Sequence, residues 1–162
     1  MDLDAILEKV TGIFAGLESG PVSPDTGALI EKSMAIAKVL VIAGPVIMLI
    51  LGLLYLFAAP KEANHHFGYR CYFGMGSELA WQFTQRIAGI IWTALGVILT
   101  VVMFIVTARF PGQDVLDMLT TAALCVLAEA GVLVLASIVI RTIVAARYDR
   151  HGERRERKVK AR

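Results

Sequence analysis

The sequence predicts an all-α integral membrane protein with an N-terminal amphipathic interfacial helix and three transmembrane helices. Of its 162 residues, 57% are hydrophobic, and the mean hydropathy is +0.67. A chain this short keeps much of its surface in contact with solvent, so this much apolar surface requires lipid around it. Two long stretches without a charged residue and the placement of lysine and arginine are the other observations behind this prediction.

Three segments are predicted to span the bilayer, at about residues 36–59, 84–108 and 117–141. The first two contain uncharged stretches, Val39–Ala59 and Ile87–Ala108, which match the roughly 20 residues needed to cross about 30 Å of hydrocarbon. The third carries Glu129 at its middle, which costs very roughly 3 kcal/mol. Each of its many Leu, Ile and Val residues favours insertion by about 0.3 to 0.6 kcal/mol, so the segment is still expected to insert.

Residues 1–25 form the predicted amphipathic helix and a linker. Apolar residues recur at intervals of three and four from Leu3 to Leu17, with polar residues mostly between them. Because this helix is too polar to span, it is expected to lie at the interface or to pack on the protein's own helices. The acidic start "MDLDAILEKV" lacks the basic region of a secretory signal, so no cleavage is expected.

Small residues give the first two spans faces for close helix packing. Gly44 and Gly52 share one side of the first span, and the comparable residues of the second span are Gly89, Thr93 and Gly96. Pro45 removes one backbone hydrogen bond and predicts a kink in the first span.

The basic residues predict the orientation, because lysine and arginine are retained on the cytoplasmic side. Nine of them follow Ile140, whereas the connection between the second and third spans holds only Arg109. We therefore expect the loop 60–83 and the tail 146–162 to be cytoplasmic and the N-terminus to be outside. The tail is expected to lie against anionic lipid. Direct binding of nucleic acid is not expected, because no folded binding module accompanies the tail.

The loop "NHHFGYRCYFGMGS" combines glycines with aromatic rings and Arg70. Ser77 is expected to cap the following helix, and rings such as Tyr69 and Trp81 are expected at the level of the lipid headgroups. Arg70 has two open interpretations. It either contacts backbone carbonyls or Glu78, or it binds a lipid phosphate or another anion.

Catalytic and metal chemistry are poorly supported in this loop. Adjacent histidines such as His65 and His66 point apart in an extended chain, and no paired-cysteine or HExxH spacing accompanies them. Cys71 and Ser77 have no identifiable group that would orient a histidine base. We therefore expect no enzyme, no metal and no cofactor, and we expect Cys71 and Cys125 to be free thiols.

Glu129 is an ionisable group at mid-membrane depth, where such residues normally face the bundle interior and find a partner. One hypothesis is structural: Glu129 is protonated or hydrogen-bonded to Thr93, Thr100 or another helix, and it holds the spans together. The other gives Glu129 a role in transport or ligand binding.

The segment "NHHFGYRCYFGMGSELAWQFTQRIAG" resembles the signature of the SdpI family of small bacterial membrane proteins. The residues that match in order are Asn64, Gly68, Tyr69, Arg70, Ser77, Trp81 and Gly89. Cys71 stands where that family often has threonine. The resemblance implies a bacterial inner-membrane location, and it implies likeness to an immunity protein that protects a cell from its own membrane-active toxin peptide and holds a transcriptional repressor at the membrane.

On this basis we expect an SdpI-like protein that confers resistance to a toxin peptide or signals envelope stress. The expected partners are membrane lipids, a toxin peptide or a cytoplasmic repressor, and a homo-oligomer is left open. The expected contact residues are the loop residues Asn64, Gly68, Tyr69, Arg70, Ser77 and Trp81. The alternative is a small transporter or accessory subunit that works through Glu129.

Overall fold

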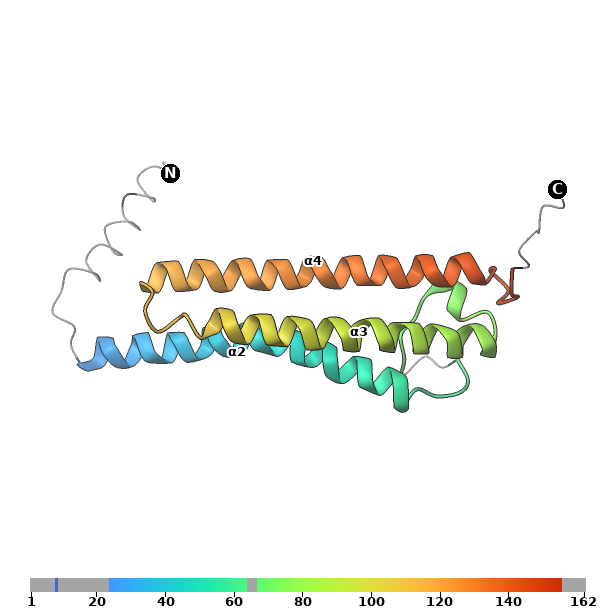
Figure 1. Cartoon of the computed structure of the whole chain (residues 1–162), viewed down its shortest axis with the longest axis horizontal. Coiled ribbons are helices and arrows are strands. Elements are labelled where there is room, and N and C mark those ends of the chain that lie inside the picture. The colour runs from blue at the N-terminus through green and yellow to red at the C-terminus, as the bar shows by residue number, and fades with distance from the viewer. Residues whose placement is uncertain (1–7, 9–23, 64–66, 156–162) are drawn as a thin grey trace.

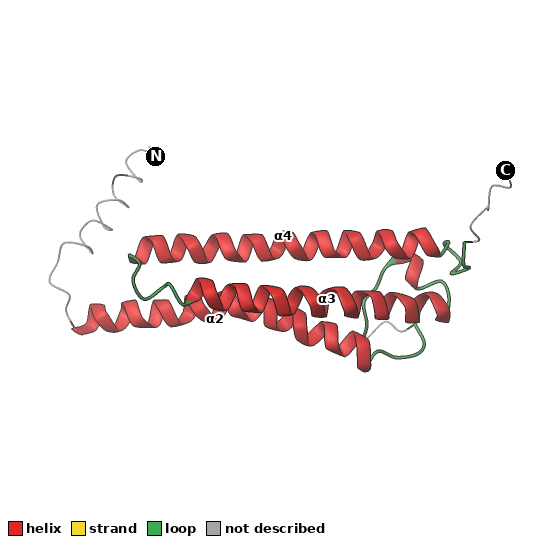
Figure 2. Ribbon diagram, viewed as in Figure 1, coloured by secondary structure: helices red, strands yellow, loops and turns green. Residues whose placement is uncertain are grey.

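The computed structural model describes residue 8, residues 24–63 and residues 67–155. Three long helices account for most of this part of the chain: α2 (Pro24–Phe57), α3 (Glu78–Thr107) and α4 (Val115–Arg147). They run side by side as an elongated bundle in which α3 is antiparallel to α2 and α4 (Figures 1 and 2). A single-turn 3₁₀ helix, η1 (Tyr72–Gly74), lies in the loop between α2 and α3.

All three helices are long and apolar enough to cross a membrane, which confirms the predicted all-α class and the three spans. In the most apolar 18-residue stretch of each helix, only 17 to 22% is buried within the protein. Most of these apolar side chains therefore face outward, toward lipid. The predicted helix in residues 1–25 lies almost entirely outside the described residues.

Each helix begins before its predicted span, and α4 also ends after it, because a helix can extend past the apolar stretch into polar surroundings. The start of α3 shows how one end is fixed. Ser77 has an extended backbone, and its hydroxyl accepts a hydrogen bond from Ala80 N at 3.2 Å. This satisfies one of the backbone donors that a helix start leaves free, and it confirms the predicted cap.

The small residues let α2 and α3 approach until their backbones touch. A Cβ atom added at Gly52 would lie 2.6 Å from Thr93 Oγ1, and one added at Gly96 would lie 2.7 Å from Leu49 Cα. Gly89 lies against Leu56 in the same interface. These contacts confirm the packing faces predicted for the two spans. Gly44 differs from the others, because it faces the Glu129 carboxyl of α4.

Two apolar clusters stabilise the two ends of the bundle. One joins all three helices and the α3–α4 connection at the end far from the loop, and its buried residues are Ala37, Val41, Met103, Phe110, Met118 and Ala122. The other is built on Ala88, Ile140 and Val144, and aromatic residues of α2, α3 and the loop pack against it. The second cluster supports the loop that carries the sequence motif.

Candidate functional site

The loop is held to α3 by the side-chain amide of Gln85. Tyr69 N donates to Gln85 Oε1 at 2.8 Å, and Gln85 Nε2 donates to Tyr69 O at 2.8 Å. Gln85 is only 3% exposed, so one amide satisfies both backbone groups of Tyr69 away from water. Gln85 was not among the residues predicted from the sequence. The available signal was its spacing, one turn after Trp81 and one turn before Gly89 on the same helix face.

Trp81 is buried under the loop, although it was expected at the level of the headgroups. Its ring is fully buried, and its Nε1 donates to Pro60 O at 2.8 Å. Gly68 has a φ of 121° and lies directly against this ring, where a Cβ would come within 2.6 Å of Trp81 Cζ2. Glycine is therefore required at position 68 for both its backbone conformation and its lack of a side chain. Gly68 and Trp81 shape the loop from within.

The chain that follows α4 packs against the other end of the loop. Ser77 Oγ donates to Gly152 O at 2.7 Å, and Gly152 has a φ of 77°. A Cβ at Gly76 would lie 2.7 Å from the His151 carbonyl carbon, so the two glycines bring the two segments into backbone contact. Ser77 therefore caps α3 and also joins the motif loop to the segment after α4.

A tight turn gives this C-terminal segment its shape. The Asp149 carboxylate accepts hydrogen bonds from Glu153 N at 2.8 Å and from His151 N at 2.9 Å. The pKa of Asp149 is held below its ordinary value, and the hydrogen bond from the Glu153 backbone is the largest cause. Arg155 N donates to Arg147 O at 2.9 Å, so the chain returns to the end of α4.

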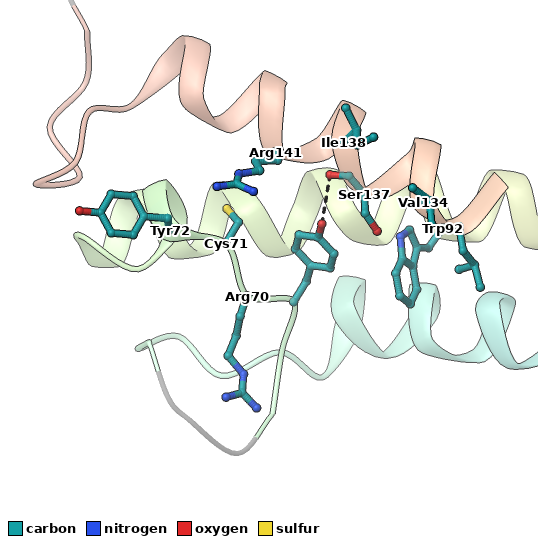
Figure 3. Close-up of a pocket in the computed structure, with 10 residues that line it drawn as sticks. Arg70, Cys71, Tyr72, Trp92, Val134, Ser137, Ile138 and Arg141 are labelled. Carbon is teal, nitrogen blue, oxygen red and sulfur yellow. Dashed lines mark hydrogen bonds between the residues drawn. The ribbon is translucent and has the colours of Figure 1, made fainter. Parts of the chain in front are cut away.

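A groove lies between the loop and α4 (Figure 3). The Tyr69 hydroxyl donates to Ser137 O at 3.2 Å and joins the two walls. Burial raises the pKa of Tyr69 above its ordinary value, at which the phenol is already protonated and able to donate near neutral pH. The groove has a volume of about 540 Å³, and its lining consists of Tyr69, Arg70, Cys71, Tyr72, Trp92, Leu133, Val134, Ser137, Ile138 and Arg141.

The groove has a cationic end and an apolar wall. Arg70 and Arg141 are exposed, and neither side chain forms a hydrogen bond or ion pair with another residue in the part of the chain that the structure describes. The predicted contact of Arg70 with Glu78 is not formed; Glu78 Oε1 instead accepts from Gln82 Nε2 at 3.0 Å. The lining contains no carboxylate. This combination of charge and apolar surface suits an anionic amphiphile.

Glu129 does not line this groove. It precedes Leu133, the nearest lining residue on α4, by one turn, about 6 Å along the helix axis. The side chain is 7% exposed, and its Oε1 has no hydrogen-bond partner. The predicted bonds to threonine are wrong: Thr93 Oγ1 also has no partner, and Thr100 Oγ1 donates to Gly96 O at 2.6 Å. Glu129 instead packs on α2 at Gly44, where the absence of a side chain makes room for the carboxyl.

Three residues of the motif segment, Asn64, His65 and His66, lie outside the described residues. Among the residues described, no group of three or more His, Cys, Asp or Glu side chains forms a metal site. Cys71 and Cys125 are free thiols, as predicted.

Comparison with known proteins identifies the chain at the level of a family. The sequence model of the SdpI/YfhL protein family matches residues 60–144, which is more than half of the chain. The chain belongs to this family. The matched region runs from the motif loop through α3 into α4, so it contains every residue that lines the groove. Comparisons with curated proteins and with solved structures gave no match.

The described motif residues of this SdpI-family chain make different contacts. Gly68, Ser77 and Trp81 hold the loop in place. Tyr69 bridges the loop to α4, and Arg70 leaves the loop toward solvent. Most of the described motif residues therefore hold the loop in place, and the surface available to a ligand comes from the loop and α4 together.

Proposed function

We propose that this SdpI-family protein is a non-enzymatic immunity or resistance protein of the bacterial inner membrane. It protects the cell against a membrane-active toxin peptide. The observation that carries the proposal is the groove, because the family region supplies both of its walls and these combine arginine with apolar side chains. Such a surface complements a peptide or lipid that is itself anionic at one end and apolar at the other.

In this proposal the loop and the C-terminus are cytoplasmic and the N-terminus is outside. The excess of lysine and arginine after Ile140 supports this orientation. The groove then faces the inner leaflet, where it intercepts the peptide or the lipid on which the peptide acts. A cytoplasmic repressor held at this surface would couple the same site to envelope-stress signalling.

Deletion of the gene followed by challenge with envelope-active peptides tests this function. We expect the deletion strain to become more sensitive and the wild-type gene to restore resistance. Arg141→Gln should restore less resistance than wild type, because it removes a charge from the groove at an exposed residue that forms no ion pair within the described ranges 24–63 and 67–155. Arg109→Gln, at the opposite end of the bundle, is the matched control. Equal survival of the deletion strain and the parent strain under every peptide would contradict the proposal.

A second candidate function, a small transporter or accessory subunit, has one observation in its favour. Glu129 presents a buried carboxyl oxygen without a partner inside the span region, as residues of proton pathways do. Proton flux into liposomes that contain the protein, abolished by Glu129→Gln, would favour this candidate. Flux that is equal for the wild type and Glu129→Gln would exclude a role for this carboxyl in proton transport.

A further inference from the structure

The groove residues on α4 are ordered by polarity along the helix. Arg141 lies near the end of α4, and Ile138, Val134 and Leu133 follow toward the middle of the span. From Arg141 to Val134 is about 10 Å along the axis, or two turns. The groove therefore has one charged end at the boundary of the span and an apolar wall that runs into it.

The charge at the boundary has no counterion among the residues that the structure describes. Arg141 forms no ion pair within the described part of the chain, and the nearest acidic residue before it on α4 is Glu129, about 18 Å deeper along the axis. Figure 3 shows the Arg141 side chain beside Cys71, with Tyr72 at the same end of the groove and Arg70 on the other side of the loop. An arginine in this position offers a planar set of donors to an anion.

The apolar wall is open to the bilayer. Val134 and Ile138 are 60% and 55% exposed within the protein, so they face the lipid that surrounds the helix. A molecule can therefore enter the groove sideways from the membrane. A phospholipid fits both features, because its phosphate lies at the boundary and its acyl chain lies beside the span.

We propose that the groove binds an anionic phospholipid, with the headgroup phosphate on Arg141 and an acyl chain along Ile138, Val134 and Leu133. Arg70 adds positive charge on the side of the loop away from Arg141 (Figure 3). This inference deepens the proposed function by naming the ligand, and it rests on that function only for the assignment of the groove to the inner leaflet. The same phosphate chemistry is available from a free phosphate ion.

Lipid binding to the purified full-length chain tests the proposal. Native mass spectrometry would compare retention of phosphatidylglycerol, phosphatidylcholine with the same acyl chains, and inorganic phosphate. We expect phosphatidylglycerol to be retained preferentially and Arg141→Gln to weaken its binding about fivefold, the effect of one basic residue close to a charged lipid surface. Arg141→Lys keeps the charge but loses the planar donors, so an intermediate loss is expected.

Arg150→Gln is the matched control. It removes the same charge at the same end of the bundle, from an exposed tail residue that does not line the groove, so it should weaken binding less than Arg141→Gln does. Equal losses for Arg141→Gln and Arg150→Gln would overturn the proposal, as would equal retention of the two lipids. Displacement of phosphatidylglycerol by an equal concentration of inorganic phosphate would assign the site to a free anion instead. The assay does not measure protection, so its failure is distinguishable from failure of the peptide challenge.

Discussion

Replacing Gly52 or Gly96 with valine is expected to break the packing of α2 against α3. At both positions the atoms that a side chain would meet include the backbone of the other helix, which cannot rotate away. Overpacking usually costs about 1 to 3 kcal/mol, and we expect the upper end of this range because the helices themselves must separate. Association of helices in lipid depends on close contact, so little else compensates. Thermal unfolding of the purified chain in detergent measures the loss.

Gly131→Val is the matched control for this prediction. Gly131 is also a glycine within a spanning helix, but it is exposed and no atom lies within 4 Å of the Cβ that a substitution would add. Its replacement should leave the unfolding temperature almost unchanged. If all three valine variants unfold at the wild-type temperature, the close packing of α2 on α3 is wrong.

Gln85→Leu is expected to release the motif loop from α3. Leucine has a similar size but cannot pair with the Tyr69 N–H and C=O groups, which would then be buried without partners. An unsatisfied buried group costs about 1 to 3 kcal/mol, so the two together cost about 2 to 6 kcal/mol unless the loop moves into water. The loop should therefore detach. In a Cys125→Ala background, the rate of maleimide modification at Cys71 should rise and the unfolding temperature should fall.

Gln82→Leu provides the comparison on the same helix. Gln82 is exposed and bonds to Glu78 Oε1 and Lys61 O at the surface, so water can replace both contacts. Gln82→Leu should change the free energy of unfolding by no more than about 0.5 kcal/mol, as is usual for surface substitutions. Equal Cys71 reactivity in the two variants would show that the Gln85 amide does not hold the loop.

The spans and their packing faces were predictable from sequence because both depend on local patterns. Apolar length alone defines a membrane segment, and glycines spaced on one side of a helix predict close approach. Gly52, Gly89 and Gly96 all lie in the α2–α3 interface. The cap at Ser77 was predictable for the same reason, since its partner Ala80 is three residues away.

The groove was not predictable in this way, because its walls come from distant parts of the chain. Tyr69 and Ser137 are 68 residues apart, and no periodicity in either segment indicates that they meet. Gln85 was missed because a glutamine near the start of a span resembles a solvated residue. The burial of Trp81 was not predictable either: tryptophan beside a span typically faces the lipid headgroups, but here the loop folds over its ring.

Sidedness of labelling is the most direct test of the claim that the groove faces the inner leaflet. In the Cys125→Ala background Cys71 reports on the loop end of the bundle. Gly112→Cys, added to a Cys71→Ala variant of the same background, reports on the exposed turn between α3 and α4. With a membrane-impermeant maleimide, intact cells should show labelling at position 112 and none at Cys71 until the membrane is permeabilised. Labelling of Cys71 in intact cells, with position 112 protected, would contradict the proposed orientation and place the groove on the outer side.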